Sequence, residues 1–73
     1  MAKTSKELPL APLERLLRVS GAKRVSKGAV REFASVVADY AHDLSAEAAV
    51  LAKHAGRKTI IDADVRMAKR KMV

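Results

Sequence analysis

Apolar residues recur every three or four positions in three stretches of this chain, and that spacing predicts three α-helices. The first stretch runs from about Pro9 to Ser20. Proline suits the first turn of a helix, where an amide hydrogen would have no intrahelical partner. Gly21 follows directly and suits the left-handed residue just past a helix end. One stripe of this helix is apolar and consists of Leu10, Leu13, Leu16 and Leu17.

The second stretch, from about Lys27 to His54, contains no proline and predicts one long helix. Ser26 is a good N-cap for this helix, and Ala55 with Gly56 mark its end. At about 1.5 Å per residue, a helix of roughly 28 residues extends about 42 Å. A compact globule of this chain length has a diameter of only about 30 Å. The helix is therefore too long for a compact monomer, and we expect a partner chain to cover it.

The last helix follows a short β-branched run, Thr59 to Ile61, which we expect to be extended. Asp62 or Asp64 opens that helix, since an acidic side chain at a helix start complements the positive end of the dipole. Residues 1–7 show no periodicity and include two lysines, so we expect a short basic N-terminal tail there. The predicted organisation is an all-α fold, short helix, long helix, short helix, in one domain over residues 8–73.

A chain of 73 residues buries too little surface for a large core and is usually stabilised by disulfides, a metal or oligomerisation. Because cysteine is absent, we expect oligomerisation. The formal charge of +7 points to a polyanionic partner. The only aromatic residues, Phe33 and Tyr40, are too few for a single-strand stacking platform, which favours duplex DNA. We find no membrane span or secretory signal, so we expect a cytoplasmic protein on the chromosome, in the nucleoid, with no membrane partner.

Charge is segregated along the chain. Between Glu32 and Ala52 the predicted long helix carries acidic residues and no lysine or arginine. Basic residues group at the two connectors on either side of that stretch, and these are Lys23, Arg24, Lys27, Arg31, Lys53, Arg57 and Lys58. A surface without a polyanionic partner would intersperse its charges, so this pattern indicates a defined edge that faces a polyanion.

Catalytic or metal-binding chemistry finds no support in the sequence. His42 and His54 are the only histidines, whereas a zinc site needs three or four convergent ligands. No serine or threonine stands in a nucleophile motif, and the chain has no glycine-rich phosphate loop. We therefore predict that the protein is not an enzyme and uses neither a metal nor another cofactor.

Three blocks of sequence resemble a known family: LPLAPLERLL from Leu8, GAKRVS from Gly21, and LAKHAGRKTI from Leu51 with Asp64 after it. In this order and spacing they closely resemble archaeal histones, and less closely the histone-fold core of eukaryotic histone H4. The resemblance covers about Leu8 to Met72. It implies a histone fold, in which a long central helix lies between two short ones and two chains pair head to tail in a handshake dimer.

The resemblance also implies a DNA-binding set on the first helix and both connectors, consisting of Arg15, Arg18, Lys23, Arg24, Lys58 and Thr59. Arg15 would enter the minor groove, where a narrow groove attracts guanidinium. Arg24 in the first connector, and Lys58 with Thr59 in the second, would face phosphates. Arg18 and Lys23 would give supporting phosphate contacts.

Structural roles follow from the same resemblance. Arg57 and Asp64 would form an ion pair that braces the second connector, which makes Arg57 mainly structural. Leu51, His54 and Asp64 match the patch through which two dimers join into a four-helix bundle. Gly21 matches a connector glycine that permits close stacking of successive dimers.

We predict a homodimer that binds, wraps and compacts double-stranded DNA without reading its sequence, and that assembles into tetramers or longer stacks, with paralogous histones as further partners. The alternative is a histone-fold subunit of a transcription factor or other complex, which would need a different partner chain. An RNA or membrane-surface binder is disfavoured, because the basic residues cluster at connectors instead of along one helix face. Lys27 and Gly28 depart from the acids that archaeal histones commonly carry at the start of the long helix, which weakens that start.

Overall fold

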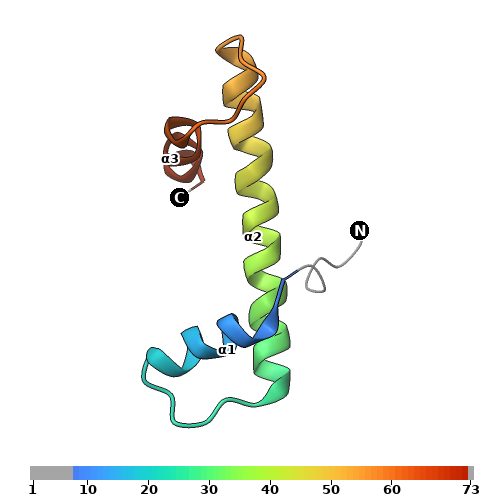
Figure 1. Ribbon diagram of the computed structural model, residues 1–73, viewed down its shortest axis with the longest axis vertical. Helices are drawn as coiled ribbons and strands as arrows, with labels where there is room; N and C mark the ends of the chain where they lie inside the picture. The colour runs from blue at the N-terminus through green and yellow to red at the C-terminus, as the bar shows by residue number, and fades with distance from the viewer. Residues whose placement is uncertain (1–7, 73) are drawn as a thin grey trace. The chain divides into compact units, whose positions relative to one another are not determined.

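The computed structural model describes residues 8–72, and over them the chain forms α1 (Leu10–Val19), α2 (Lys27–His54) and α3 (Asp62–Lys71) (Figure 1). This part of the chain contains no strand, so the predicted all-α class and the order short, long, short helix are confirmed. The predicted basic tail over residues 1–7 lies outside the described residues. Within residues 8–72, no helix is both long and apolar enough to cross a membrane.

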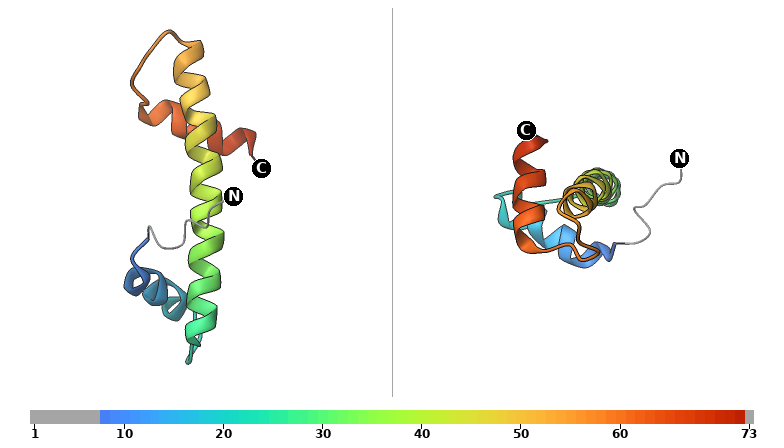
Figure 2. Two further views of the ribbon diagram at one scale, coloured as in Figure 1. Left: turned by 90° about the vertical axis from the view of Figure 1, so that its right-hand side faces the viewer. Right: turned by 90° about the horizontal axis from the view of Figure 1, so that it is seen from above.

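Two compact units make up the chain, and the boundary between them falls inside α2, between Asp39 and Tyr40. The first unit contains α1, the first connector and the first part of α2. The second unit contains the remainder of α2, the second connector and α3. Within each unit the short helix lies beside its own segment of the long helix, as the two views in Figure 2 show.

Local signals explain the helix ends of the first unit. Pro9 has an extended backbone (φ −66°, ψ 137°) and precedes the first helical residue, so α1 is one residue shorter at each end than predicted. Gly21 has a φ of 119°, as a glycine past a helix end allows, and its amide donates to the Arg18 carbonyl at 3.1 Å. Ser26 is the predicted N-cap of α2, because its Oγ accepts a hydrogen bond from the Ala29 amide at 3.0 Å.

The C-terminal end of α2, in the second unit, closes with a Schellman motif. Gly56 adopts a left-handed backbone with a φ of 76°, its amide donates to the Lys53 carbonyl at 2.9 Å, and the Arg57 amide donates to the Ala52 carbonyl at 3.0 Å. The chain then extends through Ile61 (φ −112°, ψ 172°), which directly precedes α3. The predicted stop at Gly56 and the predicted start of the last helix are both confirmed.

Small residues dominate what a single chain buries. Among residues 8–72 the buried apolar residues are Leu13, Val30, Ala34, Ala38, Ala48, Ala52 and Ala68. No large side chain in this part of the chain is fully buried. Large apolar side chains instead lie at the surface, and the most exposed are Val19 at 78 %, Val36 at 57 % and Leu16 at 55 %. One chain alone therefore holds its helices together with a thin core and leaves extensive apolar surface uncovered.

Candidate nucleic-acid interface

The second connector is braced by a bidentate ion pair between Arg57 and Asp64. Arg57 Nη1 lies 2.7 Å from Asp64 Oδ2, and Nη2 lies 3.0 Å from Oδ1. Arg57 Nη1 also donates to the Thr59 carbonyl at 3.1 Å, and the Ile61 amide donates to Asp64 Oδ2 at 2.9 Å. The Asp64 side chain is only 6 % exposed, against 35 % for Arg57. One carboxylate at the start of α3 thus anchors both ends of the connector.

These hydrogen bonds keep the pair charged. The guanidinium of Arg57, followed by the Ile61 amide, lowers the pKa of Asp64 from 3.8 to about 2, because both donors stabilise the carboxylate. The hydrogen bond to Asp64 likewise raises the pKa of Arg57 above its ordinary value. The Arg57 guanidinium is therefore already engaged within the chain and holds the connector in shape.

Lys58 and Thr59 lie on the connector that this pair braces. Both residues are exposed, and they directly follow Arg57 in the turn beyond α2. Because Arg57 holds the Thr59 carbonyl, the backbone between the two is fixed while the Lys58 side chain stays accessible. This arrangement offers one cation and one hydroxyl from a constrained backbone, which suits phosphate contact.

Four cations of the predicted DNA-binding set lie in the first unit. Arg15 and Arg18 project from α1, and Lys23 and Arg24 lie in the first connector, all of them exposed. Arg18 Nη2 forms an ion pair with Glu14 Oε2 at 2.7 Å, one helical turn away, whereas within residues 8–72 Arg15 has no ion-pair partner. Arg15 is thus the cation of α1 that is free to meet an anion without breaking an existing pair.

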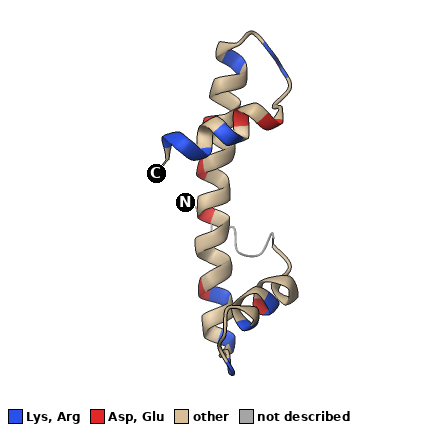
Figure 3. Ribbon diagram, turned by 90° about the vertical axis from the view of Figure 1, so that its left-hand side faces the viewer, with Lys and Arg blue, Asp and Glu red and all other residues tan. Residues whose placement is uncertain are grey.

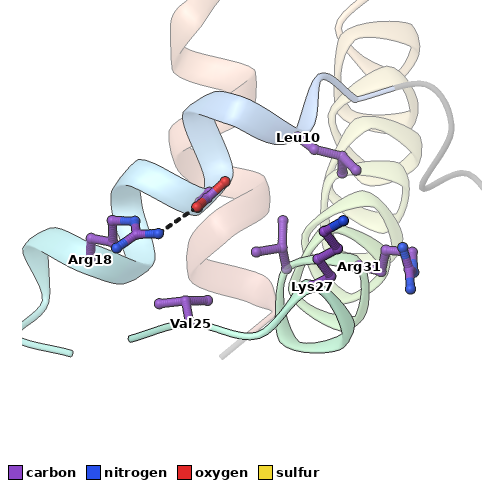
Figure 4. A pocket seen from close by; sticks show the side chains of 7 residues that line it. Leu10, Arg18, Val25, Lys27 and Arg31 are labelled. Atoms are coloured by element: carbon purple, nitrogen blue, oxygen red, sulfur yellow. Dashed lines mark hydrogen bonds and ion pairs between the residues drawn. The ribbon is translucent and has the colours of Figure 1, made fainter. Parts of the chain in front are cut away.

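A pocket of about 440 Å³ in the first unit adds two cations to which the sequence analysis gave no role. Leu10, Val25 and Val30 line its apolar part, while its charged lining consists of Glu14, Arg18, Lys27 and Arg31 (Figure 4). The grouping of Lys27 and Arg31 with the first connector is visible in the sequence, but their position around one pocket is not.

The residues predicted to join dimers all belong to the second unit. Leu51 is half-buried and His54 is exposed on the last turns of α2, while Asp64 is buried in its pair with Arg57. Gly21, predicted to permit stacking, is exposed, and nothing lies within 4 Å of the position that a Cβ would take. These positions are compatible with contacts to other copies, and their roles stay predictions.

Other charged pairs went unnoticed in the sequence. Asp62 and Arg66 pair at 3.2 Å on one helix, at a spacing of four residues that the sequence already displays. Lys71 Nζ lies 2.8 Å from Glu47 Oε2, joining the end of α3 to α2, and no sequence signal indicates this contact. Figure 3 shows the resulting alternation, with acidic residues along the middle of α2 and basic residues at the connectors and the end of α3. Within residues 8–72, no group of three or more potential metal ligands occurs.

Comparison with known proteins identifies close relatives of this chain. Residues 6–68 match the family model described as histone-like transcription factor (CBF/NF-Y) and archaeal histone. The chain is 47 % identical over 62 residues to one of the subunits of the archaeal histone HAN1 of Thermococcus zilligii, covering 85 % of this chain and 92 % of the relative. It is 44 % identical over 64 residues to probable archaeal histone 3 of Methanocaldococcus jannaschii, covering 88 % and 96 % respectively.

Proposed function

Since the chain belongs to the family of histone-like transcription factors (CBF/NF-Y) and archaeal histones, we propose that it wraps and compacts double-stranded DNA as a homodimer, without reading base sequence. Membership in this family makes it a DNA-binding chromatin protein with the histone fold, in a family whose members have structural roles. The homodimer, the wrapping and the independence from sequence are the parts that we add, and the proposed location is the chromosome in the nucleoid.

The observation that carries the proposal is the segregation of charge. From Glu32 to Ala52 the only charged residues of α2, apart from histidine, are acids, while exposed cations occupy α1 and both connectors. A polyanion would be repelled by the middle of α2 and attracted to the connectors. Contacts to phosphates from such an edge carry no base information, so they support binding that is independent of sequence.

The uncovered apolar surface supports dimerisation. The core of one chain contains mostly alanine, whereas Leu16, Val19, Val36 and Tyr40 are each nearly half exposed or more. Burial of such side chains stabilises a protein by roughly 25 cal/mol per Å², so a folded monomer would forgo much of the energy available to it. A second copy offers the same apolar surface and is the simplest covering partner.

Within this dimer the predicted residue roles form one proposal. Arg15 enters the minor groove, because it is exposed and has no ion pair to break. Arg24, and Lys58 with Thr59, bind phosphates, and the remaining two cations of the set, Arg18 and Lys23, support them. Because Arg57 is committed to Asp64, its role is to shape the connector that presents Lys58.

Longer assemblies form the second part of the proposal. Leu51, His54 and Asp64 join one dimer to the next, and Gly21 allows successive dimers to approach closely. Each of these residues belongs to a surface that a single chain leaves partly open, with the exception of the buried Asp64. Tetramers or longer stacks on DNA are the expected products, and mixing with paralogous histones would use the same surfaces.

Micrococcal nuclease digestion of long linear DNA, at several ratios of purified protein to DNA, tests this function. A ladder of protected fragments with regular increments is expected if dimers add one after another along wrapped DNA. A single protected length would indicate a closed particle of fixed size. Absence of protection, with a folded homodimer present, would refute wrapping by the homodimer.

The second candidate function is a histone-fold subunit that pairs with a different chain. It is favoured by the family description, which includes transcription factors, and by the HAN1 relative, whose name describes it as one subunit of a histone. The native mass of the purified chain distinguishes the two candidates. A stable, folded homodimer supports the first, whereas an unfolded or aggregated chain that a second polypeptide rescues supports the other.

A further inference from the structure

The outward side of α3 carries a cluster of cations that the proposed DNA edge does not use. Ala68 and Asp64 are the buried residues of α3. At about 100° per residue, Arg66 and Arg70 project roughly 160° away from Ala68 on either side, and Lys69 projects about 100° away. All three cations are exposed, and Figure 3 shows the basic end of this helix. We call Arg66, Lys69 and Arg70 the basic face of α3.

Contacts within the chain account for only part of this charge. Arg66 pairs with Asp62 at 3.2 Å, in a pair whose side chains are 65 % and 81 % exposed, so it contributes little. Within residues 8–72, Lys69 and Arg70 have no ion pair. Cations in the last turn do offset the helix dipole, but this effect fades within one turn and does not extend to Arg66. Arg66 and Arg70 also stand four residues apart, where like charges repel. The cluster therefore costs stability unless an anion meets it.

The basic face of α3 is electrostatically separate from the second connector. A helix of ten residues is about 15 Å long, and the connector joins the end of α3 opposite to its cations. At physiological ionic strength the Debye length is about 8 Å, so the two groups of cations act as two centres. Asp62 stands between them at the start of α3. A duplex that follows the connector thus meets a negative side chain before it reaches the basic face.

We propose that the basic face of α3 binds the phosphates of a second duplex segment, so that one dimer bridges two stretches of DNA. Arginine suits this role, because its planar guanidinium binds phosphate oxygens in a bidentate manner. The inference rests on the proposed function, which supplies the first duplex at the connectors. It adds a second mode of compaction, in which DNA is held together between duplexes as well as wrapped.

A bridging assay tests the proposal. One duplex is immobilised on beads, a fluorescent duplex of unrelated sequence is added with the protein, and the retained fluorescence is measured per bound protein. The double variant Lys69→Ala/Arg70→Ala should lower retention about tenfold, because two phosphate contacts per chain are lost, and should reduce the salt slope of bridging by roughly two units. Its nuclease protection should stay that of the wild-type protein.

Two control variants make the result specific. Lys69→Arg/Arg70→Lys keeps both charges and should keep bridging. Lys27→Ala/Arg31→Ala removes the same charge from the first unit and should keep bridging per bound protein. Circular dichroism establishes that each variant is folded.

The outcomes separate this inference from the proposed function. Nuclease protection by the wild-type protein without retention of the second duplex overturns bridging and leaves wrapping intact. Equal retention by Lys69→Ala/Arg70→Ala overturns the role of α3. A change in native mass without DNA would assign the basic face to contact with another protein copy, which also overturns the inference. Loss of both protection and retention in the wild-type protein refutes the proposed function itself.

Discussion

Two substitutions of the same chemical type, Gly56→Ala and Gly28→Ala, should change stability in opposite directions. At Gly56 the left-handed backbone, with a φ of 76°, is unfavourable for any residue with a Cβ, by about 1 to 2 kcal/mol. An added Cβ there meets no atom within 4 Å, so the loss is that of the backbone alone. Gly28 is helical, and the nearest atom to its added Cβ is Ser26 Oγ at an ordinary 3.9 Å. Alanine there should stabilise α2 by about 0.5 to 1 kcal/mol.

The expected difference between the two variants is therefore about 2 kcal/mol per chain, or about 4 kcal/mol per homodimer, since each substitution acts twice. Urea unfolding followed by far-ultraviolet circular dichroism measures it, with every protein at the same chain concentration, because the apparent stability of a dimer depends on concentration. Gly56→Asn should lie between wild type and Gly56→Ala, since asparagine tolerates the left-handed region. Shifts of the same sign for both alanine variants would refute the backbone argument.

Further predictions concern the cap, the ion pair and the DNA contacts. Ser26→Ala should destabilise the protein by about 1 kcal/mol per chain through loss of the N-cap of α2, and Ser26→Asp should not; thermal melts compare them. Because the pKa of Asp64 is depressed, its stabilising effect is complete above pH 3.8 and is lost as pH falls toward about 2. Acid titration of Asp64→Asn should accordingly show a shallower loss of ellipticity in that range, and an unchanged profile would contradict the assignment. Arg15→Ala should weaken duplex binding and bending while the dimer stays intact, and equal affinity at two salt concentrations would remove its minor-groove role. Lys58→Ala should lower the slope of log affinity against log salt by roughly one unit per phosphate contact, as measured by fluorescence anisotropy.

The helix boundaries could be predicted because the signals that set them are local. Ser26 caps α2 through an amide three residues away, and Gly56 ends it through bonds that span at most five residues. Hydrogen bonds of such short range depend on neighbouring residues and hardly on tertiary structure. The ends of α1 shifted by one residue, within the usual uncertainty of helix termini.

Burial and the contacts of the site were less accessible from sequence. The apolar stripe of α1 was predicted, but of its four leucines only Leu13 is buried in one chain, because the remaining cover is not part of that chain. The contact between Glu47 and Lys71 joins residues far apart in sequence, so it depends on how α3 packs. The Arg57–Asp64 pair was expected from a family resemblance, since spacing alone does not select this arginine over its basic neighbours.

The alanine-rich core has a consequence for the order of assembly. Alanine has no side-chain rotamers to lose on burial, whereas a buried leucine or isoleucine loses about 0.5 to 1 kcal/mol of rotamer entropy. Packing α3 on α2 through Ala48, Ala52 and Ala68 therefore restricts few side chains. The large side chains at the surface, such as Leu16 and Val36, keep their rotamer freedom until a second copy covers them. In the proposed homodimer most of the ordering, and most of the apolar burial that offsets it, thus falls in the step where two chains meet. Folding and association then become one cooperative transition, and its midpoint should rise with protein concentration.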